Sequence, residues 1–310
     1  MGSRGTTSAR LLREPARCAG ERCHSRRTTA HATASENVLQ IWREADAVCF
    51  DVDSTVCPSE GIDDLAEYLG KGDEGAWTAS RVPKTRASKS VVRASDNPLR
   101  RRVDPRTLRA VAALTSAAMA GGMPFQDALS ARLDLLRPSA TDIAAFLGAH
   151  PPRLTPGIAE LVHALHNRSK LVYLVSGGFR VMINPVADML GVPKERIFAN
   201  TILFAGGGQQ LGEGGSQASP TGKGAYVGFD ASEFTSQAGG KAAAARHIKA
   251  QSGARVLVMV GDGATDLEAR TQDGAGADLF VGFGGIVKRE KVLSAADWAV
   301  EDFSVLIEAL

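Results

Sequence analysis

The stretch AVCFDVDSTV, residues 47–56, decides the fold of this chain. It begins with an apolar run, Ala47–Val52, which is typical of a strand buried on both faces, and it carries two acids at the strand end, Asp51 and Asp53. In extended backbone, residues i and i+2 point to the same face, so both carboxylates can converge on one ligand. Such a pair of acids is also typical of a solvated turn. Other motifs in the chain are needed to distinguish a ligand site from a solvated turn.

Working outward, similar apolar runs indicate further strands at Lys170–Val175, Val256–Val260 and Leu279–Val281, with weaker ones at 197–203 and 298–300. Helical periodicity separates most of them, as in the stripes within 158–165 and 179–190. Alternating strands and helices predict an α/β fold with a Rossmann-like parallel sheet, helices on both faces, and ligands at the carboxyl ends of the strands.

Between the first and second strands the pattern changes. Residues 59–149 show helical periodicity at 62–69, 125–136 and 143–147 but no convincing strand, and they predict an inserted small helical cap domain. The catalytic core is then expected at 36–58 and 150–310. Within the cap, residues 81–112 are basic and lack apolar periodicity, which predicts a disordered insertion. Residues 205–223 are rich in Gly, Gln and Ser and predict a long hairpin tip or a flexible loop.

Charge and composition bound the possible functions. Residues 1–36 carry seven Arg against three Glu, and residues 81–109 carry ten Lys or Arg against two Asp. Because the formal net charge of the whole chain is only +2, the remaining residues together carry a net negative charge. This distribution argues against a nucleic-acid surface spread over the fold. No apolar run approaches the ~18 residues of a membrane span. The four cysteines suggest no disulfide framework.

Residues 1–35 are rich in Arg, Ser, Thr and Ala and lack the apolar region of a secretory signal. This composition predicts a transit-peptide-like disordered leader that directs the protein to a chloroplast or other plastid, with a mitochondrion as the alternative. An ordinary disordered tail has the same composition and remains a second reading.

Three further motifs follow predicted strands or begin predicted helices. Ser176-Gly177-Gly178 ends a strand before a helix, where backbone N–H groups and a hydroxyl can hold an anion, although a plain tight turn looks the same. Lys241 lies at a helix start, where it opposes the helix dipole but suits a bound phosphate; a solvated surface Lys is the alternative. Asp262, flanked by two glycines at a strand end, can coordinate a hard cation.

Taken in this order, the motifs resemble those of the haloacid dehalogenase-type phosphatases and, within them, the phosphoserine phosphatase family. The resemblance covers most of residues 36–80 and 113–310. Its phrases lie at 50–56, 60–63, 154–157, 176–180, 198–200, 228–230, 261–266 and 283–285.

The resemblance implies a catalytic pair and a metal. Asp51 is expected to attack phosphorus and carry the phosphoryl group, and Asp53 to protonate the leaving oxygen and then deprotonate water. One Mg²⁺ is expected between Asp51, the Asp53 backbone carbonyl and Asp262. Asp266 is expected to orient the water shell of the metal from outside.

The resemblance also implies how substrate binds. Ser176, the Gly177 amide and Lys241 are expected to hold the phosphate oxygens, assisted by Thr265. From the cap, Arg132 would clamp the substrate carboxylate and Glu60 would pair with its ammonium. Met119 and Phe125 resemble the apolar lid residues of the family. The implied reaction is the magnesium-dependent hydrolysis of O-phospho-L-serine, the last step of phosphorylated serine biosynthesis.

Several alternatives stay open at this point. The chain can be a phosphatase or phosphotransferase acting on another small phosphorylated metabolite, or a receiver-like signalling module that accepts phosphate without turnover. A receiver has no cap, so the helical insertion favours an enzyme. By their residue types alone, Arg132 fits a structural ion pair within the cap, and Met119 and Phe125 fit the core. The expected partner is a small-molecule substrate, with no nucleic acid and no membrane, and the oligomeric state stays open.

Overall fold

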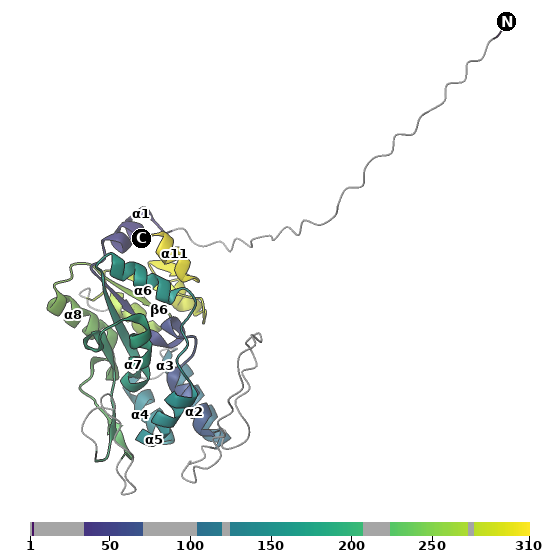
Figure 1. The fold of residues 1–310 in the computed structure, drawn as a ribbon, viewed down its shortest axis with the longest axis vertical. Helices are drawn as coiled ribbons and strands as arrows, with labels where there is room; N and C mark the ends of the chain where they lie inside the picture. The colour runs from purple at the N-terminus through teal and green to yellow at the C-terminus, as the bar shows by residue number, and fades with distance from the viewer. Residues whose placement is uncertain (1, 3–33, 71–103, 120–124, 207–223, 272–275) are drawn as a thin grey trace. The chain divides into compact units, whose positions relative to one another are not determined.

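The computed structural model describes residues 2, 34–70, 104–119, 125–206, 224–271 and 276–310 (Figure 1). Each helix and strand of the described residues lies in the compact unit Ala32–Leu310. Its core is a six-stranded parallel sheet in the order β3-β2-β1-β6-β7-β8. The strands are β1 Ala47–Phe50, β2 Leu171–Phe179, β3 Ile197–Asn200, β6 Leu257–Gly261, β7 Leu279–Phe283 and β8 Trp298–Val300. The predicted α/β fold class is confirmed.

Helices cover both faces of the sheet, because successive strand side chains alternate between two apolar clusters. Val48 and Phe50 of β1 point to one cluster, and Ala47 and Cys49 point to the other. The first face is covered by α1 Glu36–Glu44, α6 Ile158–Asn167, α7 Arg180–Leu190 and α11 Phe303–Glu308. The second is covered by α8 Gly240–Ser252, α9 Ala264–Thr271 and α10 Glu290–Leu293. Both faces of β1 are therefore dry, as its unbroken apolar run predicts.

Three acids accept backbone hydrogen bonds at the amino ends of the strands. Asp46 precedes β1 and accepts hydrogen bonds from the backbone N–H groups of Arg255 (2.8 Å) and Val256 (3.1 Å). In the same way, Asp278 accepts from the N–H of Leu257 (2.7 Å), and Asp297 from the N–H of Phe280 (2.8 Å). Each acid stands before one strand and satisfies a backbone donor at the start of its neighbour.

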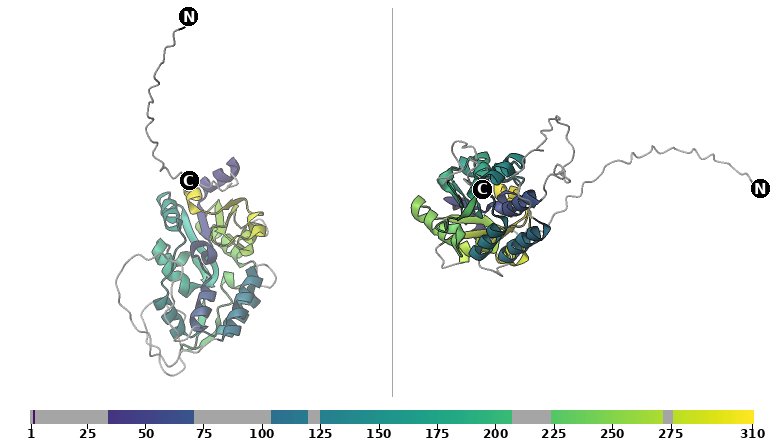
Figure 2. Two further views of the ribbon diagram at one scale, coloured as in Figure 1. Left: turned by 90° about the vertical axis from the view of Figure 1, so that its right-hand side faces the viewer. Right: turned by 90° about the horizontal axis from the view of Figure 1, so that it is seen from below.

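Within the described residues, the cap has four helices between η1 (Val52–Val56) and α6: α2 Gly61–Gly70, α3 Pro105–Met119, α4 Phe125–Leu136 and α5 Ala140–Ala149. They gather at the end of the sheet opposite α1 and α11 (Figures 1 and 2). Their apolar side chains form a third cluster together with Phe179 at the end of β2 and with the hairpin of β4 Ile202–Phe204 and β5 Tyr226–Phe229. The carboxyl end of β2 thus packs against the cap.

One boundary of the predicted insertion at 81–112 is wrong. Residues 81–103 lie outside the described part of the chain, but 105–112 form the first half of α3. Asp104 starts this helix by accepting hydrogen bonds from the N–H groups of Arg106 (2.6 Å) and Thr107 (2.9 Å). Val111 is completely buried in the cap cluster. Leu108 and Val111, three residues apart within a basic stretch, give too weak a periodicity to reveal this packing.

The strand predicted at 197–203 is two strands. The chain leaves the main sheet at Thr201, so β3 pairs in parallel with β2 while β4 pairs in antiparallel fashion with β5. The predicted irregular stretch 205–223 falls between β4 and β5, and residues 207–223 lie outside the described part. Two short 3-10 helices, η2 Lys194–Arg196 and η3 Phe234–Ser236, complete the described elements. Among the described helices, each falls short of the length and apolarity needed to cross a bilayer.

Candidate active site

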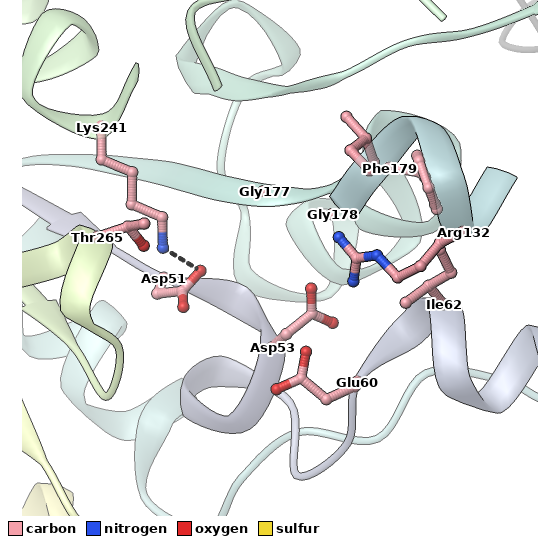
Figure 3. A pocket seen from close by; sticks show the side chains of 11 residues that line it. Asp51, Asp53, Glu60, Ile62, Arg132, Gly177, Gly178, Phe179, Lys241 and Thr265 are labelled. Atoms are coloured by element: carbon pink, nitrogen blue, oxygen red, sulfur yellow. Dashed lines mark ion pairs between the residues drawn. The ribbon is translucent and has the colours of Figure 1, made fainter. Parts of the chain in front are cut away.

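A pocket lies where the carboxyl ends of the strands meet the cap, and Figure 3 shows the side chains around it. From the core, its walls come from the segment after β1, the end of β2 and the starts of α8 and α9. From the cap, they come from α4 and from the segment that leads into α2. The residues are Asp51, Asp53, Glu60, Ile62, Leu129, Arg132, Gly177, Gly178, Phe179, Lys241 and Thr265. Residues more than 200 positions apart in sequence, such as Asp51 and Thr265, therefore share one cavity.

Asp51 lies at the bottom of this pocket, directly after β1, and is 4% exposed. Its Oδ1 pairs with Lys241 Nζ at 2.9 Å (Figure 3), and Lys241 Nζ also pairs with Asp266 Oδ1 at 2.7 Å. Burial favours the neutral amine, but Asp266 and Asp51 outweigh it and raise the pKa of Lys241 above its usual value. Lys241 is therefore a fixed positive charge beside the Asp51 carboxylate.

Asp266 is fully buried, and its two carboxylate oxygens are engaged. Oδ1 meets Lys241, and Oδ2 accepts a hydrogen bond from the Gly263 N–H at 3.0 Å. Burial, followed by repulsion from Asp51, raises the pKa of Asp266 to about 7. Gly261 makes room for it, since a Cβ there would stand 2.3 Å from the Asp266 carboxyl carbon. Asp266 is placed to orient neighbouring groups.

Asp51, Asp262 and Asp266 each offer a carboxylate oxygen, and these oxygens lie within 4.8 Å of one another. Oxygen ligands at this spacing suit a hard divalent cation such as Mg²⁺. Thr55 Oγ1 donates to Asp262 Oδ1 at 3.4 Å. The donor set therefore fits the metal that the sequence motifs imply.

Arg289 is a site residue that the sequence analysis missed. Its guanidinium forms an ion pair with Asp262 Oδ2 and lies 3.8 Å from Glu60 Oε1. It precedes the short helix α10 and follows the family-like phrase Phe283-Gly-Gly285 by four residues, and that closeness is the only sequence signal for it.

Asp53 and Glu60 form a second pair of acids beside Asp51. Asp53 Oδ1 accepts a hydrogen bond from the Gly61 N–H (2.8 Å), and Glu60 Oε1 accepts one from Ser54 Oγ (2.9 Å). Burial, with repulsion from Glu60 and Asp51, raises the pKa of Asp53 well above its ordinary value. Burial also raises the pKa of Glu60. A carboxyl group that holds its proton in this way is suited to act as a general acid.

The carboxyl end of β2 approaches Asp53 closely. A Cβ on Gly178 would lie 2.7 Å from Asp53 Oδ2 and 3.1 Å from Ser176 Oγ, so this position has no room for a side chain. Ser176 is fully buried, and its Oγ accepts a hydrogen bond from the Gly178 N–H at 2.9 Å. Asn200 Nδ2 donates to the Gly177 carbonyl at 2.8 Å, a contact that the sequence analysis did not anticipate.

From α4, Arg132 reaches the pocket and is only 3% exposed. Its Nε donates to the Ala128 carbonyl at 3.1 Å, and its guanidinium points toward the carboxylates of Asp53 and Glu60 (Figure 3). Burial lowers the pKa of Arg132. Thr265 lines the same pocket as Lys241. Met119 ends α3 and Phe125 begins α4, but their side chains lie outside the described part of the structure, so the lid hypothesis stays a prediction.

Comparison with known proteins identifies clear relatives. Residues 45–272 match the family model of the haloacid dehalogenase-like hydrolases. The chain is 42% identical to the chloroplastic phosphoserine phosphatase of Arabidopsis thaliana over 89% of this chain and 75% of the relative. It is 38% identical to the phosphoserine phosphatase of Bos taurus over 87% of this chain and 95% of the relative.

Among solved structures, DsGPDH of Dunaliella salina matches with a TM-score of 0.64 and 33% identity over 89% of this chain. The match spans 38% of the Dunaliella salina chain, so this protein resembles one part of that longer chain.

Proposed function

Because the chain belongs to the phosphoserine phosphatase family of the haloacid dehalogenase-like hydrolases, we propose that it hydrolyses O-phosphoserine to serine and inorganic phosphate. One observation carries the proposal. The Asp51 carboxylate shares a pocket with Lys241 on the core side and with the acid Glu60 and the cation Arg132 on the cap side. A phosphate bearing a small zwitterion presents the complementary charges.

Asp51 is proposed as the nucleophile. Its carboxylate oxygen forms a bond to phosphorus while the bond from phosphorus to the serine oxygen breaks, and Asp53 gives its proton to that leaving oxygen. Asp53, now ionised, takes a proton from a water molecule that attacks the phosphorus. The oxygen of Asp51 then leaves, so phosphate is released and both acids return to their initial states. The raised pKa of Asp53 supports the first of these proton transfers.

Phosphate binding is assigned to Ser176, the Gly177 amide, Lys241 and Thr265. Asp51, Asp262 and the backbone carbonyl of Asp53 would hold Mg²⁺, which when bound neutralises carboxylates that would otherwise repel a phosphate dianion. Asp266 is assigned outside this ligand set, because its oxygens already meet Lys241 and Gly263. The role of these residues is therefore to supply preorganised charge around phosphorus.

The cap is proposed to select the substrate. Arg132 would form a two-pronged contact with the carboxylate of phosphoserine, and Glu60 would pair with its ammonium group. In cells, the chloroplastic relative supports a plastid location for this chain. The leader proposed to direct it there, 1–35, lies almost wholly outside the described residues.

The decisive experiment measures phosphate release from O-phosphoserine with and without Mg²⁺. Asp51→Asn keeps the shape of the side chain but removes the nucleophile, and we expect at least a ~10³-fold loss of kcat with little change in thermal stability. Near-parental hydrolysis by this variant would end the proposal.

A second variant tests the substrate. Arg132→Ala should lower kcat/KM for O-phosphoserine by ~10²-fold, while hydrolysis of an aryl phosphate without a carboxylate changes far less. Equal losses on both substrates would instead assign the enzyme to another small phosphorylated metabolite.

A further inference from the structure

The peptide unit that joins Gly177 to Gly178 is held on both sides. Asn200 Nδ2 donates to the Gly177 carbonyl at 2.8 Å, and the Gly178 N–H donates to Ser176 Oγ at 2.9 Å. Among the described residues no peptide bond is cis, and in a trans unit the C=O and N–H point in opposite directions. The two hydrogen bonds therefore act on opposite edges of one rigid plane and fix its rotation.

Asn200 is itself held in one orientation. Thr235 Oγ1 donates to Asn200 Oδ1 at 3.1 Å, which leaves the NH₂ end of the amide facing Gly177. Asn200 is fully buried and Thr235 is 3% exposed. In such a place a reversed amide would set its own carbonyl oxygen against the Gly177 carbonyl oxygen, two acceptors with no proton between them, which costs free energy. The chain of contacts from Thr235 through Asn200 to Gly177 thus has one favoured direction.

This chain of contacts also joins the two parts of the site that face phosphate. Asn200 ends β3 beside the end of β2, and Thr235 lies in η3. The segment η3 packs against the start of α8 so closely that a Cβ on Gly240 would stand 2.0 Å from the Phe234 carbonyl oxygen. Lys241 is the next residue. A shift of Asn200 or Thr235 would therefore move the end of β2 relative to Lys241.

We propose that Asn200 is a positioning residue for phosphate binding, which directs the Ser176 hydroxyl through the peptide between Gly177 and Gly178. Because Ser176 Oγ accepts the Gly178 N–H, its own proton points away from that bond and is available to a phosphate oxygen. Without Asn200 the peptide can rotate, the Gly178 N–H leaves Ser176, and the hydroxyl loses its orientation. This inference rests on the proposed function, since it takes Ser176 as a ligand of phosphate.

The test is a double-mutant cycle on the full enzyme with Mg²⁺, with kcat/KM for O-phosphoserine and inhibition by orthovanadate as readouts. Ser176→Ala should cost ~10²-fold in kcat/KM, as expected for the loss of one preorganised donor. Asn200→Ala should cost ~10-fold, mainly in kcat and vanadate affinity. If Asn200 acts through Ser176, the double variant should lose ~10²-fold, and independent effects would instead multiply to ~10³-fold.

Matched variants separate positioning from stability. Thr201→Val removes hydrogen bonds to Arg180 and Glu233 beside Asn200 but outside the proposed chain of contacts, and it should leave kcat unchanged. Thr235→Val should reproduce part of the Asn200 effect, and Thr235→Ser should restore activity. If Asn200→Ala fails to fold, Asn200→Asp replaces it with a side chain of the same shape.

Two results would overturn the inference: an Asn200 variant with parental vanadate affinity, or losses that multiply in the double variant. A harmless Ser176→Ala would overturn it together with the phosphate role of Ser176. In either of the first two cases, the function proposed for Asp51 would still stand if Asp51→Asn remained inactive.

Discussion

Arg289 brings a guanidinium to the acids grouped around the candidate metal site. It pairs with Asp262 Oδ2, on one of the carboxylates proposed to bind the metal, and it lies 3.8 Å from Glu60. Its side chain is 21% exposed, so the positive charge is only partly screened by water. Arg289 therefore offsets repulsion among the neighbouring carboxylates, and we expect a binding metal ion to displace it from Asp262.

This competition predicts the sign of a mutation. Arg289→Gln should tighten Mg²⁺ binding several-fold in calorimetric titrations without substrate, because Asp262 no longer has to leave an ion pair. The same variant should lower the thermal stability of the metal-free protein. Lys288→Gln is the matched control, since it removes an adjacent charge whose partner is the exposed Glu301. Weaker Mg²⁺ binding by Arg289→Gln would show that the arginine supports the metal site.

At the level of the secondary-structure elements, we predict that the acids before the strands stabilise the fold. Hydrogen bonds from the N–H groups of Val256 and Arg255 lower the pKa of Asp46. A carboxyl whose pKa is lower in the folded protein stabilises the fold above its unfolded pKa of ~4, and this stabilisation is lost as pH falls through the folded value.

Asp46→Ala should accordingly lower the free energy of unfolding by about 1 kcal/mol at pH 7, a modest figure because the side chain is partly solvated. The difference from the parent protein should shrink toward zero as pH falls below ~4. Urea unfolding at several pH values measures it. A difference that stayed constant with pH would rule out the charge of Asp46 as its source.

Because α3 begins at Pro105, we expect two deletions of similar length to differ in their effect on stability. Deleting 81–103 leaves α3 complete, whereas deleting 81–112 removes its Asp104 cap and the buried Val111. We expect the first variant to keep its thermal stability and the second to lose the cooperative folding of the cap. Val111→Ala gives the point measurement, with an expected loss of about 2 kcal/mol, and Ala112→Ser on the exposed side is the control.

The sequence predicted those features that a local pattern encodes. The apolar runs that end in Asp51, Ser176 and Asp262 identified strands, and parallel strands place their carboxyl ends at one edge, so the convergence of these residues followed. The sequence analysis assigned no functional role to Arg289, Asn200 or Thr235. Each of them is proposed to act through a contact with another element, and sequence periodicity does not reveal contacts between elements. The start of α3 was missed because its helical signal sits inside a run of basic residues.

At the scale of the whole molecule, the site depends on a core that begins with α1. Ser35 caps this helix, and its Oγ accepts a hydrogen bond from the Val38 N–H at 3.4 Å. Trp42 is completely buried, donates from Nε1 to the Leu306 carbonyl at 3.0 Å, and meets Trp298 edge to face. The first helix thus joins the last helix and the last strand, and it is followed in the chain by β1, which leads into Asp51.

Two truncations test whether the folded unit begins at this helix. A chain lacking residues 1–33 retains Ser35 and Trp42, and it should match the full chain in unfolding free energy and in phosphate release. A chain lacking 1–44 loses the burial of Trp42, which by itself is worth about 3–5 kcal/mol, so it should unfold at a clearly lower temperature. Trp42→Ala in the full chain should reproduce most of this loss, because the indole supplies most of the contact. If removing 1–44 left stability unchanged, α1 would be dispensable and the core would begin at β1; if removing 1–33 destabilised the enzyme, the leader would belong to the folded unit.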